Sequence, residues 1–124
     1  MRFLTYIKSD ESMPAGPPPP ELFEAIGKFG EEIGKTGVLL DQGGLAATSD
    51  SVQIRVADGK VTVTDGPFAE TKEVIGGYAM YDVRSKDEAV ELSRRFMQIH
   101  ADIWPGFVGT SEIRQVFGPS DFEG

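Results

Sequence analysis

The feature that most constrains the fold is a β-hairpin pattern between residues 51 and 65. Apolar and polar side chains alternate through both halves of this segment, which indicates two strands that each have one apolar face. Asp58-Gly59 separates the halves, and Asp-Gly is a preferred pair for a two-residue type I′ turn. That turn sets the pairing of the strands, so Val52 is expected opposite Asp65. Because side chains alternate between faces, Asp65 is then expected on the apolar face of the hairpin.

The hairpin runs directly into a stretch that is dense in polar chemistry, DGPFAETKE at residues 65–73. Two interpretations stay open for Asp65. It caps backbone N–H groups of the following turn, at Phe68 or the residue after it, or it acts as a general acid or base whose pKa is raised by the apolar face. Phe68, Thr71 and Lys72 are candidate ligand-binding residues. For Thr71 and Lys72 the alternative is a solvated position, with Lys72 paired to a neighbouring glutamate.

Periodicity in the rest of the chain predicts two helices and three more strands. In chain order these are a strand at 2–8, a helix at 21–36, a strand at 75–83, a helix opened by a capping box at 85–88 and a strand at 111–117. Glu91 and Arg95 are expected to form an i, i+4 ion pair in the second helix. This order predicts an α+β fold of ferredoxin-like type, an antiparallel sheet with two helices on one face.

Two stretches between these elements have the composition of connections. Residues 38–48 form a short apolar run that reaches Gly43-Gly44, and the glycine pair predicts a turn. Residues 14–20 form a proline-rich loop. The loop is a stiff spacer that leads into the first helix, a docking ligand for a proline-reading domain or a flap over a site, and the spacer is the favoured interpretation.

The strand patterns also predict association. The strands at 2–8 and 75–83 are apolar on both of their faces, yet two helices can cover only one face of a sheet. Another copy of the chain is the simplest cover for the second face. We therefore expect a homodimer in which the two sheets pack face to face.

Length, charge and cysteine content narrow the class of protein. The 124 residues suit one domain, which we expect at 1–118, followed by an acidic tail at 119–124. A net charge of −8 argues against binding nucleic acid or anionic lipid, because both depend on Lys and Arg. The chain has no cysteine and no run near the ~20 apolar residues that span a bilayer. We expect a cytoplasmic protein without a nucleic-acid or membrane partner.

Two residues outside the motif are further site candidates. His100 is the single histidine and lies near the end of the second helix, where the helix dipole favours it. If that helix end reaches the sheet edge, His100 would face Asp65 or Arg114 and form an acid–base pair. Arg114 would hold a ligand carboxylate in a bidentate pair or contact an acidic neighbour. No carboxylate cluster predicts a metal site, and no cofactor is expected.

The hairpin and the motif together resemble the YCII-related family, in particular its DGPF-type members. Identity to the family signature covers all nine residues of Asp65–Glu73, and the first strand and the closing EIRQVF also fit. The resemblance implies a dimeric α/β barrel in a family without a generally established activity. Some relatives carry a His–Asp pair proposed as an active site, which does not map onto this chain. Many relatives are encoded near extracytoplasmic-function sigma factors, which makes a regulatory role a further hypothesis.

Three functions follow as hypotheses. The favoured one is a small-molecule-binding or regulatory homodimer with a site for a polar or anionic metabolite beside the DGPFAETKE loop. The alternative is a small cofactor-free enzyme, an isomerase, lyase or hydrolase, that uses Asp65 with His100 as acid and base. The third is a structural partner domain that acts through its dimer or its acidic surface.

Overall fold

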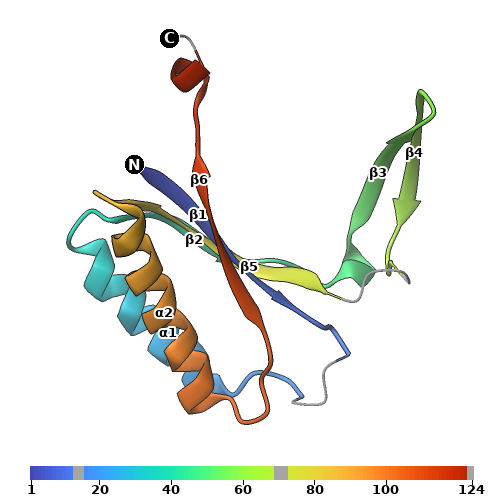
Figure 1. Cartoon of the computed structure of the whole chain (residues 1–124). Coiled ribbons are helices and arrows are strands. Elements are labelled where there is room, and N and C mark those ends of the chain that lie inside the picture. The colour runs from blue at the N-terminus through green and yellow to red at the C-terminus, as the bar shows by residue number, and fades with distance from the viewer. Residues whose placement is uncertain (13–15, 69–72, 123–124) are drawn as a thin grey trace.

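A four-stranded antiparallel sheet lies at the centre of the chain (Figure 1). The computed structural model describes residues 1–12, 16–68 and 73–122. The strand order is β2-β5-β1-β6, in which β1 is Arg2–Ser9, β2 is Leu39–Gly44, β5 is Val74–Asp82 and β6 is Thr110–Val116. Helices α1 (Pro20–Gly34) and α2 (Lys86–Ile103) lie together on one face of the sheet. The predicted α+β class is confirmed. The sheet of one chain is open, and the barrel that the family resemblance implies, which two chains would form together, stays a prediction.

The face of the sheet beneath the helices holds the hydrophobic core. Phe3 and Tyr81 are cross-strand partners on β1 and β5, and both are buried against Phe29 of α1. Leu4 and Met80, one position along each strand, are also paired and are only half-buried. Since alternate residues of a strand point to opposite faces, Leu4 and Met80 lie on the face that the helices leave uncovered.

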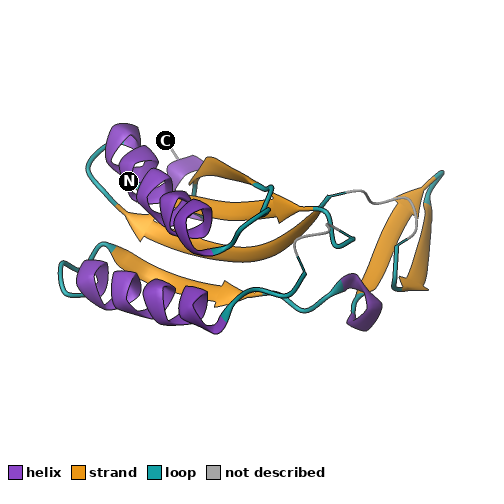
Figure 2. Cartoon of the chain, turned by 90° about the horizontal axis from the view of Figure 1, so that it is seen from below, coloured by secondary structure: helices purple, strands orange, loops and turns teal. Residues whose placement is uncertain are grey.

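The hairpin forms a separate two-stranded sheet, which we call the arm (residues 52–65). Strand β3 (Val52–Ala57) pairs with β4 (Lys60–Asp65), and the register places Val52 opposite Asp65 as predicted. Asp58 and Gly59 have φ values of 52° and 74°, the left-handed backbone that a type I′ turn needs at both central positions. Figures 1 and 2 both show the arm beyond the end of the main sheet, away from the helices.

The fourth strand of the main sheet is β2, and the prediction of a turn at Gly43-Gly44 is wrong. Both glycines lie in β2 and pair with Tyr78 and Gly77 of β5. The ring of Tyr78 lies across Gly43, where an added Cβ would meet the ring carbon Cε1 at 2.9 Å. Glycine here makes room for a neighbouring aromatic ring and does not reverse the chain.

Both helices begin where the sequence indicates, and one expected ion pair differs. Pro20 opens α1, while Ser85 caps α2 and accepts the N–H of Glu88 at 3.2 Å. Arg95 does not pair with Glu91. It reaches across to Glu32 of α1 at 2.8 Å and lies over the ring of Phe29, 4.9 Å from the ring centroid. Contact with a second helix replaces the local pair.

Candidate functional site

The DGPFAETKE segment begins at the root of the arm, where the backbone is closely packed. The N–H of Gly66 donates to the carbonyl of Ser51 at 2.8 Å and closes the base of the hairpin. A Cβ on Gly66 would lie 1.6 Å from the carbonyl oxygen of Thr48, so only glycine fits. The peptide bond from Gly66 to Pro67 is cis. Part of the motif therefore has a structural task, which is to join the arm to the body.

A second contact fastens the arm root to the loop after β1. The carboxylate of Glu11 accepts the backbone N–H of Thr48 at 2.8 Å and also the Thr48 hydroxyl. These hydrogen bonds stabilise the charged form, so they lower the pKa of Glu11. Thr48 opens the short 3₁₀ helix Thr48–Asp50 that leads into β3. Glu11 thus holds the segment from which the arm projects.

The uncovered face of the main sheet, which we call the open face, carries most of the charged side chains near this root. The strand register places eight residues on this face: Leu4, Tyr6, Lys8, Asp41, Tyr78, Met80, Glu112 and Arg114. Tyr78 donates its hydroxyl to Asp41 at 3.0 Å, and this bond to a carboxylate raises the pKa of Tyr78. No helix among the described elements packs on this face.

Four of the charged and polar side chains here form one cluster, the Lys8 cluster. The ammonium of Lys8 lies 2.8 Å from Glu112 and 3.7 Å from Glu73, the last residue of the motif. Tyr6 donates its hydroxyl to the other carboxylate oxygen of Glu112 at 2.6 Å. Hydrogen bonding to Glu112 raises the pKa of Lys8, and the bonds from Lys8 and Tyr6 lower the pKa of Glu112. The cluster joins the motif to β1 and β6.

Arg114 extends this cluster along β6. It lies two residues from Glu112, so both side chains are on the open face. Its positive charge helps to lower the pKa of Glu112, but within the described ranges its guanidinium has no hydrogen bond or ion pair. Arg114 is exposed and has the planar fork of donors that binds carboxylate or phosphate groups. Its place on this face agrees with a ligand-binding role, which stays a prediction.

The other candidates in the motif are placed only in part. Asp65 ends β4 on the apolar face of the arm, and its side chain is exposed because no described residue covers that face. Phe68 is half-buried just beyond the arm root. Thr71 and Lys72 lie outside the described residues, as does Ala69, so no placement of these three bears on the prediction.

His100 lies in a different part of the molecule from Asp65. Its ring is 5% exposed and packs against Phe96 and Phe107, with centroids 4.9 and 5.1 Å away. The Nδ1 atom lies 3.0 Å from the carbonyl of Phe96, which assigns that nitrogen as the donor. Burial lowers the pKa of His100. Figures 1 and 2 show α2 set apart from β4, so one chain does not bring His100 and Asp65 together.

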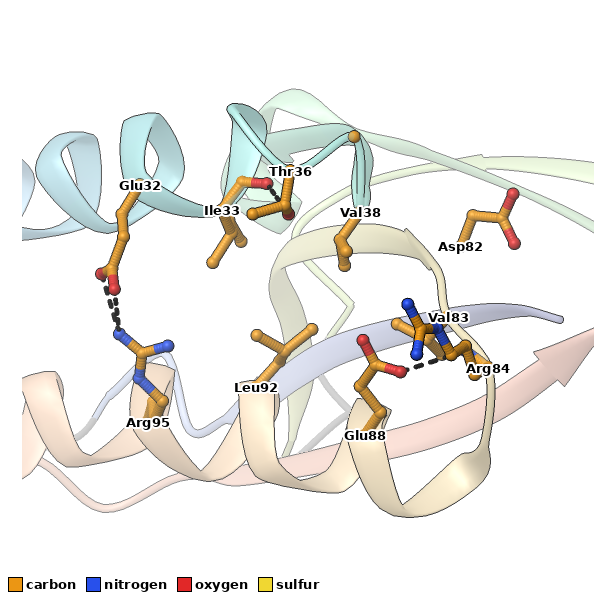
Figure 3. Close-up of a pocket in the computed structure, with 11 residues that line it drawn as sticks. Glu32, Ile33, Thr36, Val38, Asp82, Val83, Arg84, Glu88, Leu92 and Arg95 are labelled. Atoms are coloured by element: carbon orange, nitrogen blue, oxygen red, sulfur yellow. Dashed lines mark hydrogen bonds and ion pairs between the residues drawn. The ribbon is translucent and has the colours of Figure 1, made fainter.

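A cleft of about 550 Å³ opens between α1 and α2, at the opposite end of β5 from the motif (Figure 3). Nine residues of strand separate the two ends by about 30 Å. Two of the carboxylates in the cleft already have partners: Glu32 pairs with Arg95, and Glu88 accepts the backbone N–H of Arg84 at 3.1 Å. This hollow is a gap between helix ends, and the open face remains the stronger candidate site.

Sequence reasoning missed Lys8, Tyr6, Glu112 and Glu11. Tyr6 and Lys8 are two residues apart on one strand, which places them on one face, but nothing local shows that β6 lies beside β1. Strand adjacency was the missing information.

In the described parts of the chain, no group of acidic, histidine or cysteine side chains is arranged to hold a metal ion. Over the same residues, no helix is long and apolar enough to cross a membrane.

Comparison with known proteins supports the family resemblance. A family model for the YCII-related domain matches residues 1–115. A curated relative, "Uncharacterized protein R00369" of Rhizobium meliloti (strain 1021), is 40% identical over 63 residues. That match covers 51% of this chain and 48% of the relative, so the chain spans about half the length of the protein it matches.

Proposed function

Because the chain belongs to the YCII-related family, we propose that it is a homodimer that binds a small anionic or polar metabolite on the open face, beside the DGPFAETKE segment. One observation carries the proposal: Arg114 extends a charged cluster that ends on the last residue of the motif. The cluster supplies a fixed ammonium and a tyrosine hydroxyl, and Arg114 supplies a guanidinium that has no hydrogen bond or ion pair among the described residues.

The cations of this face favour an anionic ligand, because its carboxylates Asp41 and Glu112 are already engaged by Tyr78 and by Lys8 and Tyr6. Arg2, Lys8 and Arg114 all belong to the two neighbouring strands β1 and β6, in a chain whose net charge is −8. A cationic group placed within an acidic protein raises the local concentration of anions and can bind them through charge-assisted hydrogen bonds. Lys8 is already held by Glu112, so Arg114 is the group that would contact the ligand first.

In the proposed dimer a second sheet covers the open face, so that the end of this face becomes a sheltered binding site. Leu4 and Met80 lie at its centre and are half-buried in one chain, and a second sheet packed on them would bury them further. The Lys8 cluster lies toward the end of the face where the motif meets the sheet. With two open faces packed together, this end forms a rim at which a small molecule is sheltered from water on one side.

The test is ligand binding by wild type and two arginine variants. A panel of mono- and dicarboxylates, keto acids and phosphates is screened by thermal unfolding, followed by calorimetric titration of each compound that stabilises the protein. A ligand at a hundred times its Kd should stabilise the fold by about 2.7 kcal/mol. Arg114→Met should weaken binding at least about tenfold, as expected for loss of a charge-assisted contact.

Arg94→Met is the matched control, because Arg94 is an exposed arginine of α2 that pairs only within its own helix. It should bind as wild type does. The proposal fails if no compound of the panel raises the unfolding temperature, or if Arg114→Met binds as tightly as Arg94→Met. No observation in the structure favours the enzymatic alternative, since Asp65 and His100 are not brought together within one chain.

A further inference from the structure

We infer that each arm packs its apolar stripe onto a second copy of the chain, so that two arms are exchanged across the dimer. The stripe consists of five side chains on one face of the arm: Val52, Ile54, Val56, Val61 and Val63. This inference rests on the homodimer of the proposed function and identifies a surface that holds it. It concerns the arm, which lies apart from the sheet faces discussed above.

The arm has the pattern of a sheet with one face toward protein and one toward water. The stripe residues are between 55% and 71% exposed in one chain. The opposite face carries Gln53, Arg55 and Thr62, which are suited to solvent. A lone two-stranded hairpin is marginally stable in water and needs cover on its apolar face. The alternation of the sequence is therefore explained only if another surface meets the stripe.

The described residues of the chain's own body do not provide that cover. The root of the arm is fixed by the hydrogen bond between Gly66 and Ser51 and by the contacts of Glu11 with Thr48. With the root held in this way, the arm points beyond the end of the main sheet (Figures 1 and 2). Every residue of β3 and β4 is exposed. The surface that covers the stripe must come from another molecule.

A second copy fits the charge of the arm and offers it an apolar surface. Arg55 and Lys60 balance Asp58 and Asp65 within the arm, so the −8 net charge of the chain lies elsewhere. A neutral arm can approach an acidic copy without the repulsion that two acidic bodies would have. The second copy also offers uncovered apolar side chains of its own near β2, namely Leu40, Leu45 and Ile75, which are 43–50% exposed. In a two-fold dimer with exchanged arms each arm would lie on the other copy, so both stripes are covered by one operation.

Arm exchange would also link the dimer to the site. Residues 66–73 connect the arm root to Glu73 in the Lys8 cluster. An arm held by the partner would add to the contacts that fix one end of this connection at the arm root, and the cluster holds the other end. We therefore expect ligand affinity to fall when the arm is released, with the cluster itself unchanged.

Photo-crosslinking tests the inference directly. Benzoylphenylalanine is placed at Val61, on the stripe, or at Thr62, on the opposite face of the same strand. Irradiation should give covalent dimers from position 61, with the cross-link mapped to the partner by mixing isotopically light and heavy protein. Position 62 should give few. Cross-links from position 61 that stay within one chain, or equal dimer yields from both positions, would overturn the inference.

A pair of charge substitutions on neighbouring residues gives an independent measure. Ile54→Asp places a carboxylate on the stripe, and Gln53→Asp places the same charge on the opposite face. Sedimentation should show that Ile54→Asp raises the dimer dissociation constant at least tenfold and that Gln53→Asp leaves it unchanged. Equal dissociation constants for the two variants would count against arm exchange, and circular dichroism checks that both bodies are folded.

The outcomes separate this inference from the proposed function. If the stripe variants dimerise and bind ligand as wild type does, arm exchange is wrong and the binding function stands. If position 61 cross-links to the partner while no ligand binds, arm exchange stands and the binding function is wrong.

Discussion

At the scale of single residues, Gly66 shows why part of the motif is fixed by packing and not by chemistry. A methyl group at this position would lie 1.6 Å from the backbone carbonyl oxygen of Thr48, and backbone cannot move aside as a side chain can. Gly66→Ala should therefore reduce the free energy of unfolding by about 1–3 kcal/mol, the usual cost of overpacking. Chemical denaturation measures this loss, and hydrogen exchange should show faster exchange at the arm root.

Gly76→Ala is the control for this substitution. Gly76 lies in β5, and an added Cβ there would meet no atom within 4 Å. The control should be close to wild type. Equal losses for the two variants would show that the cost comes from removing a glycine and not from the contact with Thr48.

His100 makes a prediction about pH at the same scale. Burial lowers its folded-state pKa, so the unfolded state binds a proton more readily than the folded state does. The stabilisation from His100 is present above the ordinary histidine pKa of about 6.5 and is lost as pH falls from there through the folded-state pKa. Urea unfolding between pH 7.5 and 5.5 should show this loss in wild type and a flatter profile in His100→Phe.

The carboxylates with lowered pKa values do not contribute to the change of stability between pH 7.5 and 5.5. Glu11 and Glu112 lose their stabilising contribution only as pH falls below the ordinary carboxyl pKa of about 4.3. Parallel profiles for wild type and His100→Phe above pH 5.5 would contradict the assignment of a buried neutral imidazole.

At the scale of elements, Arg95 joins the two helices and Arg94 does not. Arg95 pairs with Glu32 of α1 and lies over the ring of Phe29, whereas Arg94 pairs with Glu91 one turn away on α2. Arg95→Met should cost about 1 kcal/mol of stability, from an ion pair and a cation–π contact together. Arg94→Met should cost less. Thermal unfolding compares the two, and an equal or greater loss for Arg94→Met would contradict the interhelical role.

The arm root gives a second prediction for an element. Glu11→Gln should release the 3₁₀ turn at Thr48, because an amide presents only one acceptor to a site with two donors. Hydrogen exchange should rise at residues 48–51 and stay unchanged in the main sheet. Asp10→Asn is the neighbouring control, since among the described residues Asp10 bonds only to Ser12. Unchanged exchange at the arm root in Glu11→Gln would show that this contact does not hold the arm root.

Local pattern was enough to predict most elements, and the failures have a common cause. The hairpin register followed from Asp58-Gly59, because a two-residue turn leaves only one pairing. The role of β2 could not be predicted, because Gly43 is set by a ring on a strand thirty-five positions away in sequence. The Lys8 cluster was missed for the same reason, since it depends on β1 and β6 being neighbours.

At the scale of the whole molecule, the described residues of one chain leave two apolar surfaces without cover: the open face and the stripe of the arm. The sequence predicted the first, because β1 and β5 are apolar on both faces. It also placed Asp65 on the apolar side of the hairpin but gave no sign that this hairpin leaves the main sheet. A homodimer with exchanged arms accounts for both surfaces at once and places the motif at the rim of the interface.

The measurement that tests this most directly uses the methionines as reporters. The protein is labelled with ¹³C-methyl methionine, and a soluble gadolinium chelate is added to enhance the relaxation of accessible methyl groups. Met80 lies on the open face and Met1 is 52% exposed, so Met1 serves as the internal reference. If a second copy covers the open face, the Met80 signal should be shielded while that of Met1 relaxes strongly. Strong relaxation of Met80, as half-exposure in one chain would give, would contradict the dimer on which the proposed site depends.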